Sequence, residues 1–400
     1  MAVKFKYIEE FERLGFGLFI HFGLYSVEGK GEWYQSTHNV PQEKYLQLVD
    51  RFKVKKTWAK ELVQQAKKTG CKYITITTRH HDGFSLYDTC GLNEFDAPHS
   101  PTGRDLIREF VDECRKADIV PFFYHTLLDW WHKDFNENFP EYLKYLRKSV
   151  EILCKNYGKI GGIWFDGMWS KRGADWEEDA LYSMIRKYQP EAMIINNTGL
   201  SALGEVGHYE LDSVTFERGN PAFIDQSTKY RAGEMCQVLN DHWGYAAEDC
   251  NYKSMRELIG NLVDCRRFNC NFLLNTGLKG NGSVNEMDRA ILTEIGKWVK
   301  ANKGFIYGAY AADIQADNAC VLTDGKYYYA AIYDVPMSAS VNVALGGKIK
   351  EVTIHTDRKI KNARWLDTGE RIKAKKNTFI ATPFLYGSSK AVRIARFELN

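Results

Sequence analysis

Several short apolar runs in the sequence end in side chains that could do chemistry. Runs of this kind are typical of β-strands, and in β/α folds catalytic groups gather where strands end, because loops form a pocket around rigidly held side chains. A single His or Asn at such a point is more often a hydrogen-bonded structural residue. Seven polar endings together favour a functional pocket: His21, His80 with His81, Tyr124 with His125, Asp166, Asn196 with Asn197, Glu217 and Asn275.

Asp166 is the strongest single candidate for a catalytic carboxylate. It ends the run Gly-Ile-Trp-Phe-Asp-Gly, in which an apolar strand leads directly to a carboxylate that a glycine follows. An Asp before Gly is also common in ordinary turns. Trp164, two positions earlier, shares the strand face of Asp166, which sets the carboxylate beside an aromatic wall. This pairing suits a sugar, whose C–H face packs on aromatic rings while a carboxylate attacks the anomeric carbon.

Cleavage of a glycosidic bond would need a second carboxyl group to protonate the leaving oxygen. Glu217 is the candidate, because it ends the run Ser-Val-Thr-Phe-Glu two strands after Asp166 and could face it across a barrel mouth. The alternative is a surface glutamate paired with Arg218, and spacing alone does not decide between the two. Burial and the charge of Asp166 would both raise the pKa of Glu217, as a general acid requires. Three glutamates are rivals for this role: Glu32, Glu210 and Glu234.

Recognition of sugar hydroxyls needs neutral donors and acceptors, and an imidazole supplies one of each. His21, His80 and His81 fit this need. Adjacent strand residues face opposite ways, so His80 and His81 enter one pocket together only if the strand ends between them. An apolar wall could come from tryptophans, although a Trp is more often a core residue. The candidates are Trp33, Trp164 and Trp243.

Eight strand-like runs alternate with segments of helical period and predict an α/β fold, an irregular (β/α)8, TIM-like barrel. The strands are predicted at 16–24, 72–78, 120–125, 162–166, 192–197, 213–217, 234–239 and 271–276. Helices are predicted at 57–69, 105–117, 141–156, 176–188, 254–267 and 286–301. Between Ile195 and Val238, Gly, Asn and Pro are frequent and no long amphipathic run separates the strands, which predicts long loops there.

The character of the sequence changes after about Ile306. Short β-rich runs alternate with Asp-Gly, Gly-Gly and Thr-Gly turns, which predicts a C-terminal antiparallel β-sandwich. These runs are 320–323, 327–333, 340–344, 351–355, 379–386 and 392–397. We therefore expect a catalytic barrel domain at 1–304 and a β-sandwich domain at 305–400.

Composition excludes several classes of function. A net charge of +3 gives no electrostatic case for nucleic acid or an anionic membrane, and no run reaches membrane-span length. The nine cysteines are scattered without a CxxC pair, which indicates free thiols in a reducing compartment. With no signal-peptide layout at the N-terminus, we expect a cytoplasmic protein. The glycines at 277, 280 and 282 lack the order and the Lys of a P-loop and indicate only a turn.

Seven segments together resemble glycoside hydrolase family 29, the α-L-fucosidases. They include the double-histidine strand Tyr73–Phe84 and the Trp-Phe-Asp-Gly motif within Gly162–Gly167, and they follow the family's order along the barrel. The other five are Phe16–Ser26, Gly31–Tyr34, Val120–His125, Asn240–Tyr245 and Asn271–Gly277. The sequence departs from the family at Phe22, where Trp is usual, and at Phe216, where Pro is frequent.

The resemblance implies a retaining exo-α-L-fucosidase that acts on fucosylated glycans by double displacement, without metal or organic cofactor. It assigns the nucleophile to Asp166 and, through the segment Asp212-Ser-Val-Thr-Phe-Glu217, favours Glu217 as acid/base. The substrate-binding positions that we expect are His21, Glu32, Trp33, His80, His81, Tyr124, Trp164 and Trp243.

Two other classes of function remain as alternatives. A fucose-binding, catalytically weak relative of the same fold would keep the pocket without turnover. A metal-dependent hydrolase would need closely spaced ligands, and the sequence has no His-x-His on its first strand and no helical His-Glu-x-x-His.

Overall fold

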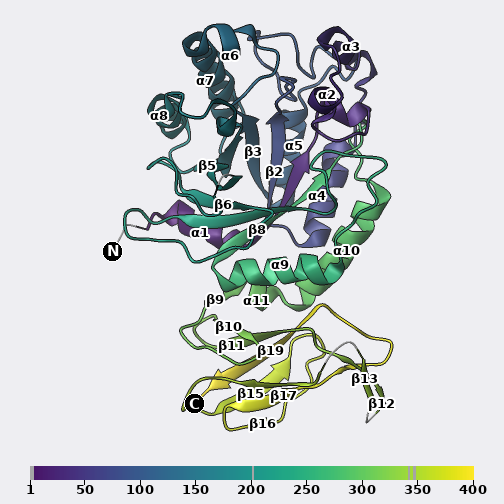
Figure 1. Cartoon of the computed structure of the whole chain (residues 1–400), viewed down its shortest axis with the longest axis vertical. Coiled ribbons are helices and arrows are strands. Elements are labelled where there is room, and N and C mark those ends of the chain that lie inside the picture. The colour runs from purple at the N-terminus through teal and green to yellow at the C-terminus, as the bar shows by residue number, and fades with distance from the viewer. Residues whose placement is uncertain (1–3, 201, 341–342, 346–347) are drawn as a thin grey trace.

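The computed structural model describes residues 4–200, 202–340, 343–345 and 348–400 (Figure 1). Its larger part is a closed barrel of eight parallel strands in chain order, β1 to β8, which confirms the predicted fold. The strands are β1 (Phe16–His21), β2 (Tyr73–Arg79), β3 (Val120–Thr126), β4 (Gly162–Asp166), β5 (Met193–Asn196), β6 (Ser213–Glu217), β7 (Ala232–Val238) and β8 (Cys270–Gly277).

The longer helices lie around this barrel, and their ends carry the expected capping residues. The side chains of Asp105, Ser254 and Asn285 accept hydrogen bonds from the first turns of α5, α9 and α10, and Gly70 ends α4 in the left-handed conformation. The helices are α1 (Lys6–Leu14), α2 (Tyr34–Thr37), α3 (Gln42–Leu46), α4 (Trp58–Thr69), α5 (Leu106–Ala117), α6 (Lys133–Glu137), α7 (Phe139–Asn156), α8 (Glu178–Tyr188), α9 (Met255–Arg267), α10 (Glu286–Ala301) and α11 (Lys303–Gly308). Short 3-10 turns are η1 (Leu24–Val27), η2 (Val49–Arg51), η3 (Met168–Lys171) and η4 (Thr198–Leu200).

The barrel is irregular between β5 and β7, as the sequence predicts. Among the described residues, η4 is the only helical turn between β5 and β6, and no helix lies between β6 and β7. Strand β5 pairs with β6 through a single register position. The buried carboxylate of Asp212 reinforces this seam. It accepts hydrogen bonds from the Ile194 amide, Lys229 and Arg186, so that charged side chains connect strands that backbone pairing holds weakly.

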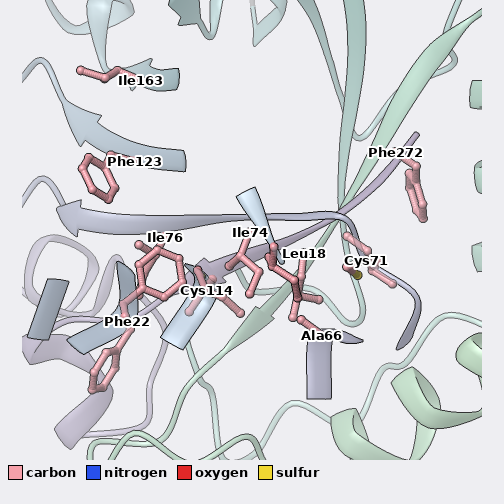
Figure 2. Packing of buried hydrophobic residues seen from close by; sticks show 14 of the residues in the cluster. Leu18, Phe22, Ala66, Cys71, Ile74, Ile76, Cys114, Phe123, Ile163 and Phe272 are labelled. Atoms are coloured by element: carbon pink, nitrogen blue, oxygen red, sulfur yellow. The ribbon is translucent and has the colours of Figure 1, made fainter. Parts of the chain in front are cut away.

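Side chains of the strands alternate between two apolar layers. Leu18, Ile74 and Ile76 point outward into the layer between strands and helices, as Figure 2 shows. Phe19 and Tyr73 point inward, where Phe11 of α1 packs against Tyr73 at 5.6 Å between ring centroids. Helix α1 therefore fills the interior near the start of the strands, opposite the edge where the polar residues lie.

The C-terminal part is built from antiparallel sheets, as predicted. The five-stranded sheet contains β9 (Tyr310–Ala311), β10 (Cys320–Thr323), β11 (Tyr328–Tyr333), β15 (Ile360–Trp365) and β19 (Val392–Leu399). The smaller sheets contain β12 (Met337–Ser340), β13 (Val343–Leu345), β14 (Lys350–Thr353), β16 (Ala374–Lys375), β17 (Thr378–Ala381) and β18 (Phe384–Leu385). One face of the larger sheet, including Leu322 and Ile394, packs onto the barrel core beside α9 and α11 (Figure 1).

Several details of this part differ from the predicted runs. Strands β9, β15 and β16 lie outside them, and β12 overlaps them only at Ser340. In β15, Lys361, Asn362 and Arg364 interrupt the apolar pattern, and a bulge shifts the register. The run 379–386 is two strands, β17 and β18, separated at Pro383. Of the run 340–344, positions 341 and 342 lie outside the described residues.

Within the described residues, no helix is long and apolar enough to cross a membrane.

Candidate active site

A small cavity of about 110 Å³ lies at the carboxyl ends of the barrel strands. Nine of the ten site residues predicted from the sequence line it, and Glu32 is the exception. The lining side chains come from the ends of several strands and from the loops that follow them. The lining residues are Phe19, His21, Trp33, His80, His81, Tyr124, Trp164, Asp166, Trp169, Asn197, Leu200, Glu217 and Trp243.

Both histidines after β2 reach the cavity. Strand β2 ends at Arg79, and a turn follows in which the Gly83 amide donates to the His80 carbonyl at 3.0 Å. The strand alternation that would separate His80 from His81 therefore no longer applies, and their rings lie 4.2 Å apart. The sequence pattern required the strand to end between the two histidines; it ends one residue earlier, at Arg79, and both rings line the cavity.

Asp166 lies at the end of β4 and accepts hydrogen bonds on both carboxylate oxygens. Asn197 Nδ2 and Trp169 Nε1 donate to Oδ1 at 3.2 and 3.3 Å. The Tyr124 hydroxyl donates to Oδ2 at 3.1 Å, and His81 Nε2 lies 3.4 Å from the same oxygen. Burial by itself would raise the pKa of Asp166, but the hydrogen bonds from His81, Asn197 and Tyr124 outweigh it and lower that pKa. The carboxyl group is therefore held as an anion.

Glu217 lies at the end of β6 and is connected to Asp166 through a single amide group. Asn197 Nδ2 donates to Glu217 Oε2 at 2.5 Å and to Asp166 Oδ1 at 3.2 Å. Thr215 fixes this amide by donating its hydroxyl hydrogen to Asn197 Oδ1 at 3.2 Å. Burial, followed by the negative charge of Asp166, raises the pKa of Glu217. Two neighbouring carboxyl groups thus have pKa values displaced in opposite directions, which suits a base or nucleophile beside an acid.

Two imidazoles in the cavity are held neutral. Burial lowers the pKa of His21 to about 3 and lowers the pKa of His80 well below its usual value. His21 Nδ1 donates to Asn275 Oδ1 at 2.7 Å, which leaves Nε2 as a hydrogen-bond acceptor. His80 Nδ1 is buried and has no hydrogen-bond partner within the described part of the chain. The His80 side chain itself is among the residues that line the cavity.

Aromatic rings form the apolar walls of the cavity. Trp164 stacks on Tyr124 with centroids 5.8 Å apart, and Phe19 packs edge-on against Trp164 at 5.2 Å. Trp33 stacks on Trp169 at 5.8 Å at another part of the wall. The cavity therefore combines aromatic faces with carboxylate and imidazole groups, the combination that a sugar needs.

The three rival glutamates do not line this cavity. Glu32 is buried, and its carboxylate accepts from the Gly244 amide at 2.7 Å, beside the wall residue Trp243. Glu234 lies inside the barrel, where Tyr73 and Trp164 donate to it and burial raises its pKa to about 7. Glu210 faces Arg186 outside the cavity. Glu217 is the glutamate that reaches the cavity together with Asp166.

Two strand-end residues point away from the cavity. His125 bonds the Thr126 carbonyl and Ser149, and Asn196 donates to Tyr182. At the two positions that depart from the family pattern, Phe22 packs on Phe52 and Phe216 packs in the outer core. Neither departure displaces a lining residue.

Sequence reasoning missed four residues of the lining or their roles. Asn197 was recognised as a polar strand end, but nothing in the sequence indicates that its amide bridges two carboxylates. Trp169 follows the Asp166-Gly167 turn in η3, and its spacing to Asp166 could have been recognised as a second aromatic beside the carboxylate. Phe19 and Leu200 carry no pattern that separates them from core or loop residues.

Metal binding has no support in the geometry of the described residues. Among them, no group of three or more His, Cys, Asp or Glu side chains has an arrangement that could hold a metal ion.

Comparison with known proteins gives consistent matches. The family model described as Alpha-L-fucosidase matches residues 3–304. The Alpha-L-fucosidase of Dictyostelium discoideum is 27% identical over 369 residues, which cover 82% of this chain and 78% of that protein. The structure of α-L-fucosidase isoenzyme 1 from Paenibacillus thiaminolyticus is 29% identical, covers 99% of each chain and has a TM-score of 0.86.

A more distant structure is similar in fold. It is an α-L-fucosidase of family GH29 from Bacteroides thetaiotaomicron, described as a trapped covalent intermediate in complex with 2-fluoro-fucosyl fluoride. It is 22% identical, covers 100% of this chain and 97% of its own, and has a TM-score of 0.82.

Proposed function

The chain belongs to the α-L-fucosidase family, glycoside hydrolase family 29, and from this premise we propose that it is a retaining exo-α-L-fucosidase. Its substrate is terminal α-linked L-fucose on an oligosaccharide or glycoconjugate. Asp166 is the nucleophile and Glu217 the acid/base. His21, His80, His81 and Tyr124 bind the sugar with Trp33, Trp164 and Trp243, while Glu32 supports the wall beside Trp243.

The observation that carries this proposal is the amide of Asn197, which donates to both carboxyl groups. Because one nitrogen lies 3.2 Å from Asp166 Oδ1 and 2.5 Å from Glu217 Oε2, these oxygens cannot be farther apart than the two distances added, about 5.7 Å. Retaining glycosidases hold their carboxyl groups about 5–5.5 Å apart, whereas inverting enzymes need roughly 6.5–9.5 Å to admit a water molecule. The bound favours double displacement.

The reaction proceeds in two displacements. Asp166 attacks the anomeric carbon and forms a glycosyl ester while Glu217 donates its proton to the departing glycosidic oxygen. Glu217, now ionised, then takes a proton from water, whose oxygen attacks the anomeric carbon and releases Asp166 and fucose. The raised pKa of Glu217 and the lowered pKa of Asp166 match the protonation states in which the first step must begin.

The size of the cavity supports cleavage at a chain end. At about 110 Å³ the cavity is too small to hold more than one sugar ring, as expected for removal of a terminal residue. The His80 ring, which lines the cavity, and the free Nε2 of His21 supply polar contacts for ring hydroxyls. We propose that the aromatic wall covers the apolar sugar face and its methyl group.

Proton NMR of the wild type with 4-nitrophenyl α-L-fucoside tests this function. Retention requires that α-L-fucose forms first and that the β anomer appears later through mutarotation. Initial β-L-fucose would contradict the double displacement. Saturable binding of fucose without any hydrolysis would instead support the alternative function, a fucose-binding protein with weak catalytic activity. Hydrolysis should also survive dialysis against a chelator, because no step needs a metal.

We retain a cytoplasmic location as a proposal. All nine cysteines lie in the described part of the chain and none forms a disulfide, which is typical of a reducing compartment. Fractionation of the source cells with an antibody against the protein tests this location, and recovery from the secreted fraction would contradict it.

A further inference from the structure

Arg218 directly follows Glu217 next to the cavity and is not itself among the lining residues. Its guanidinium carbon is 5.1 Å from the centre of the Trp243 ring, and both Glu217 and Trp243 line the cavity. The Arg218 side chain itself is exposed. The guanidinium group is therefore at the mouth, between the proposed acid/base and one aromatic wall.

The backbone at Arg218 is in an unfavourable conformation. Strand β6 ends at Glu217, and Arg218 adopts φ 51° in the left-handed region, held there by a 2.9 Å hydrogen bond from its amide to the Cys236 carbonyl. A residue with a Cβ atom is disfavoured in this region, because the Cβ atom crowds the backbone. The turn takes the side chain out of the strand alternation and brings it over Trp243.

The guanidinium group has donors left over. Its Nη2 donates to the Asp241 carbonyl at 2.9 Å, while the Asp241 carboxylate accepts from Asn251 instead. Arg218 makes no ion pair with any residue that the structure describes. A guanidinium carries five N–H donors in a rigid fork, so several remain available at the mouth.

We propose that Arg218 forms the subsite for the leaving sugar and donates hydrogen bonds to its oxygen atoms. This inference rests on the proposed function. Glu217 must protonate the oxygen that joins fucose to the next sugar, and the cavity is too small to hold a second sugar ring as well. The next sugar therefore lies over the rim, where the free donors of Arg218 are. Its ligand is a pyranose with hydroxyl or ring oxygens near the scissile bond.

A purely structural role for Arg218 makes a different prediction. Arg218 also supports the loop that carries Trp243 through the Asp241 carbonyl, so its removal could weaken binding of fucose itself. The neighbouring Lys253 supports the same loop by donating to the Asn240 carbonyl at 2.7 Å, without lining the cavity. Lys253→Met is therefore a matched control for loosening of this loop.

The test compares two substrates in the wild type, Arg218→Asn, Arg218→Lys and Lys253→Met. Asn tolerates the left-handed conformation well, so Arg218→Asn should fold at least as stably as the wild type. One substrate is α-L-fucosyl fluoride, whose leaving group makes no sugar contact and needs no protonation. The other is the fucosyl disaccharide that the wild type cleaves fastest among the common linkages. Activity is measured as kcat/KM at a pH below the alkaline limb.

We expect Arg218→Asn to lower kcat/KM for the disaccharide about 10- to 100-fold, because one or two hydrogen bonds from a charged donor are lost. For the fluoride, kcat/KM should fall less than about threefold, because that leaving group makes no such bonds. Arg218→Lys should fall between, because it keeps the charge without the fork. Lys253→Met should change both substrates by one common factor. Equal losses on both substrates in Arg218→Asn would overturn the inference, as would a wild type that cleaves the fluoride but no disaccharide. A wild type inactive on the fluoride would reject the proposed function instead.

Discussion

Replacement of Asn197 by Ala removes an amide group that donates to both of the proposed catalytic carboxyl groups. In the wild type the amide lies 2.5 Å from Glu217 and 3.2 Å from Asp166. A hydrogen bond to a charged group contributes about 1.5–3 kcal/mol. If one such bond is lost from the transition state, kcat/KM at the pH optimum should fall roughly 10- to 100-fold.

The pH profile gives a sharper test than the rate. Asn197 lowers the pKa of both carboxyl groups, so its removal raises the pKa of Asp166 and of Glu217. Activity needs ionised Asp166, which sets the acid limb, and protonated Glu217, which sets the alkaline limb. Both limbs of the kcat/KM profile should therefore move to higher pH. The alkaline limb should move further, because Asn197 is the strongest influence that lowers the pKa of Glu217 and only a lesser one at Asp166.

The neighbouring Asn196 provides the control. Its amide donates to Tyr182 away from the cavity, so we expect Asn196→Ala to cost stability without moving either limb of the profile. The assay is hydrolysis of 4-nitrophenyl α-L-fucoside from pH 4 to 9 for both variants, at temperatures where circular dichroism shows each to be folded. An Asn197→Ala profile that keeps both limbs, or moves them to lower pH, would refute the bridging role.

Three further outcomes follow from the same structure. Glu234→Gln should remove a pH dependence of stability: burial raises the pKa of Glu234 from 4.5 to about 7, so its contribution is complete below pH 4.5 and is lost as the pH rises through 7. In urea unfolding, the free energy of unfolding of the wild type relative to that of Glu234→Gln should fall by about 2–3 kcal/mol between pH 4.5 and pH 8. A difference that does not change with pH would contradict the assignment. Trp169→Phe removes a donor to Asp166 and should move the acid limb of kcat/KM to higher pH with the alkaline limb unchanged; movement of the alkaline limb alone would contradict this. Arg79→Met leaves the buried Asp129 carboxylate unpaired and should cost about 3–5 kcal/mol in urea unfolding, whereas a loss below 1 kcal/mol would contradict the pairing.

The barrel strands and the two carboxyl groups at their ends could be predicted from the sequence, because the patterns that indicate them lie in consecutive residues. A buried strand that ends in a carboxylate and glycine can be recognised from consecutive residues, as at Asp166. The strand ends also converge by a general property of β/α barrels. The order of the predicted strands was therefore enough to predict that most lining residues meet at one end of the barrel.

Contacts between distant segments were not accessible in the same way. The amide of Asn197 bridges two carboxyls only because Thr215 orients it from the neighbouring strand. Whether His80 and His81 share a pocket depended on the residue at which β2 ends, which the turn closed by Gly83 decides. Glu32 was expected to contact the substrate, but the Gly244 amide, far along the chain, holds its carboxylate outside the lining. Each case depends on tertiary packing that no local pattern records.

Azide rescue of the two carboxyl variants tests the central claim most directly. Asp166→Ala and Glu217→Ala are incubated with 4-nitrophenyl α-L-fucoside and sodium azide, and the products are identified by NMR. If Asp166 is the nucleophile, azide replaces it and gives β-L-fucosyl azide with Asp166→Ala. If Glu217 is the acid/base, azide attacks the glycosyl-enzyme of Glu217→Ala and gives α-L-fucosyl azide. An Asp166→Ala enzyme that remains fully active without azide, or the same azide anomer from both variants, would contradict the assigned roles.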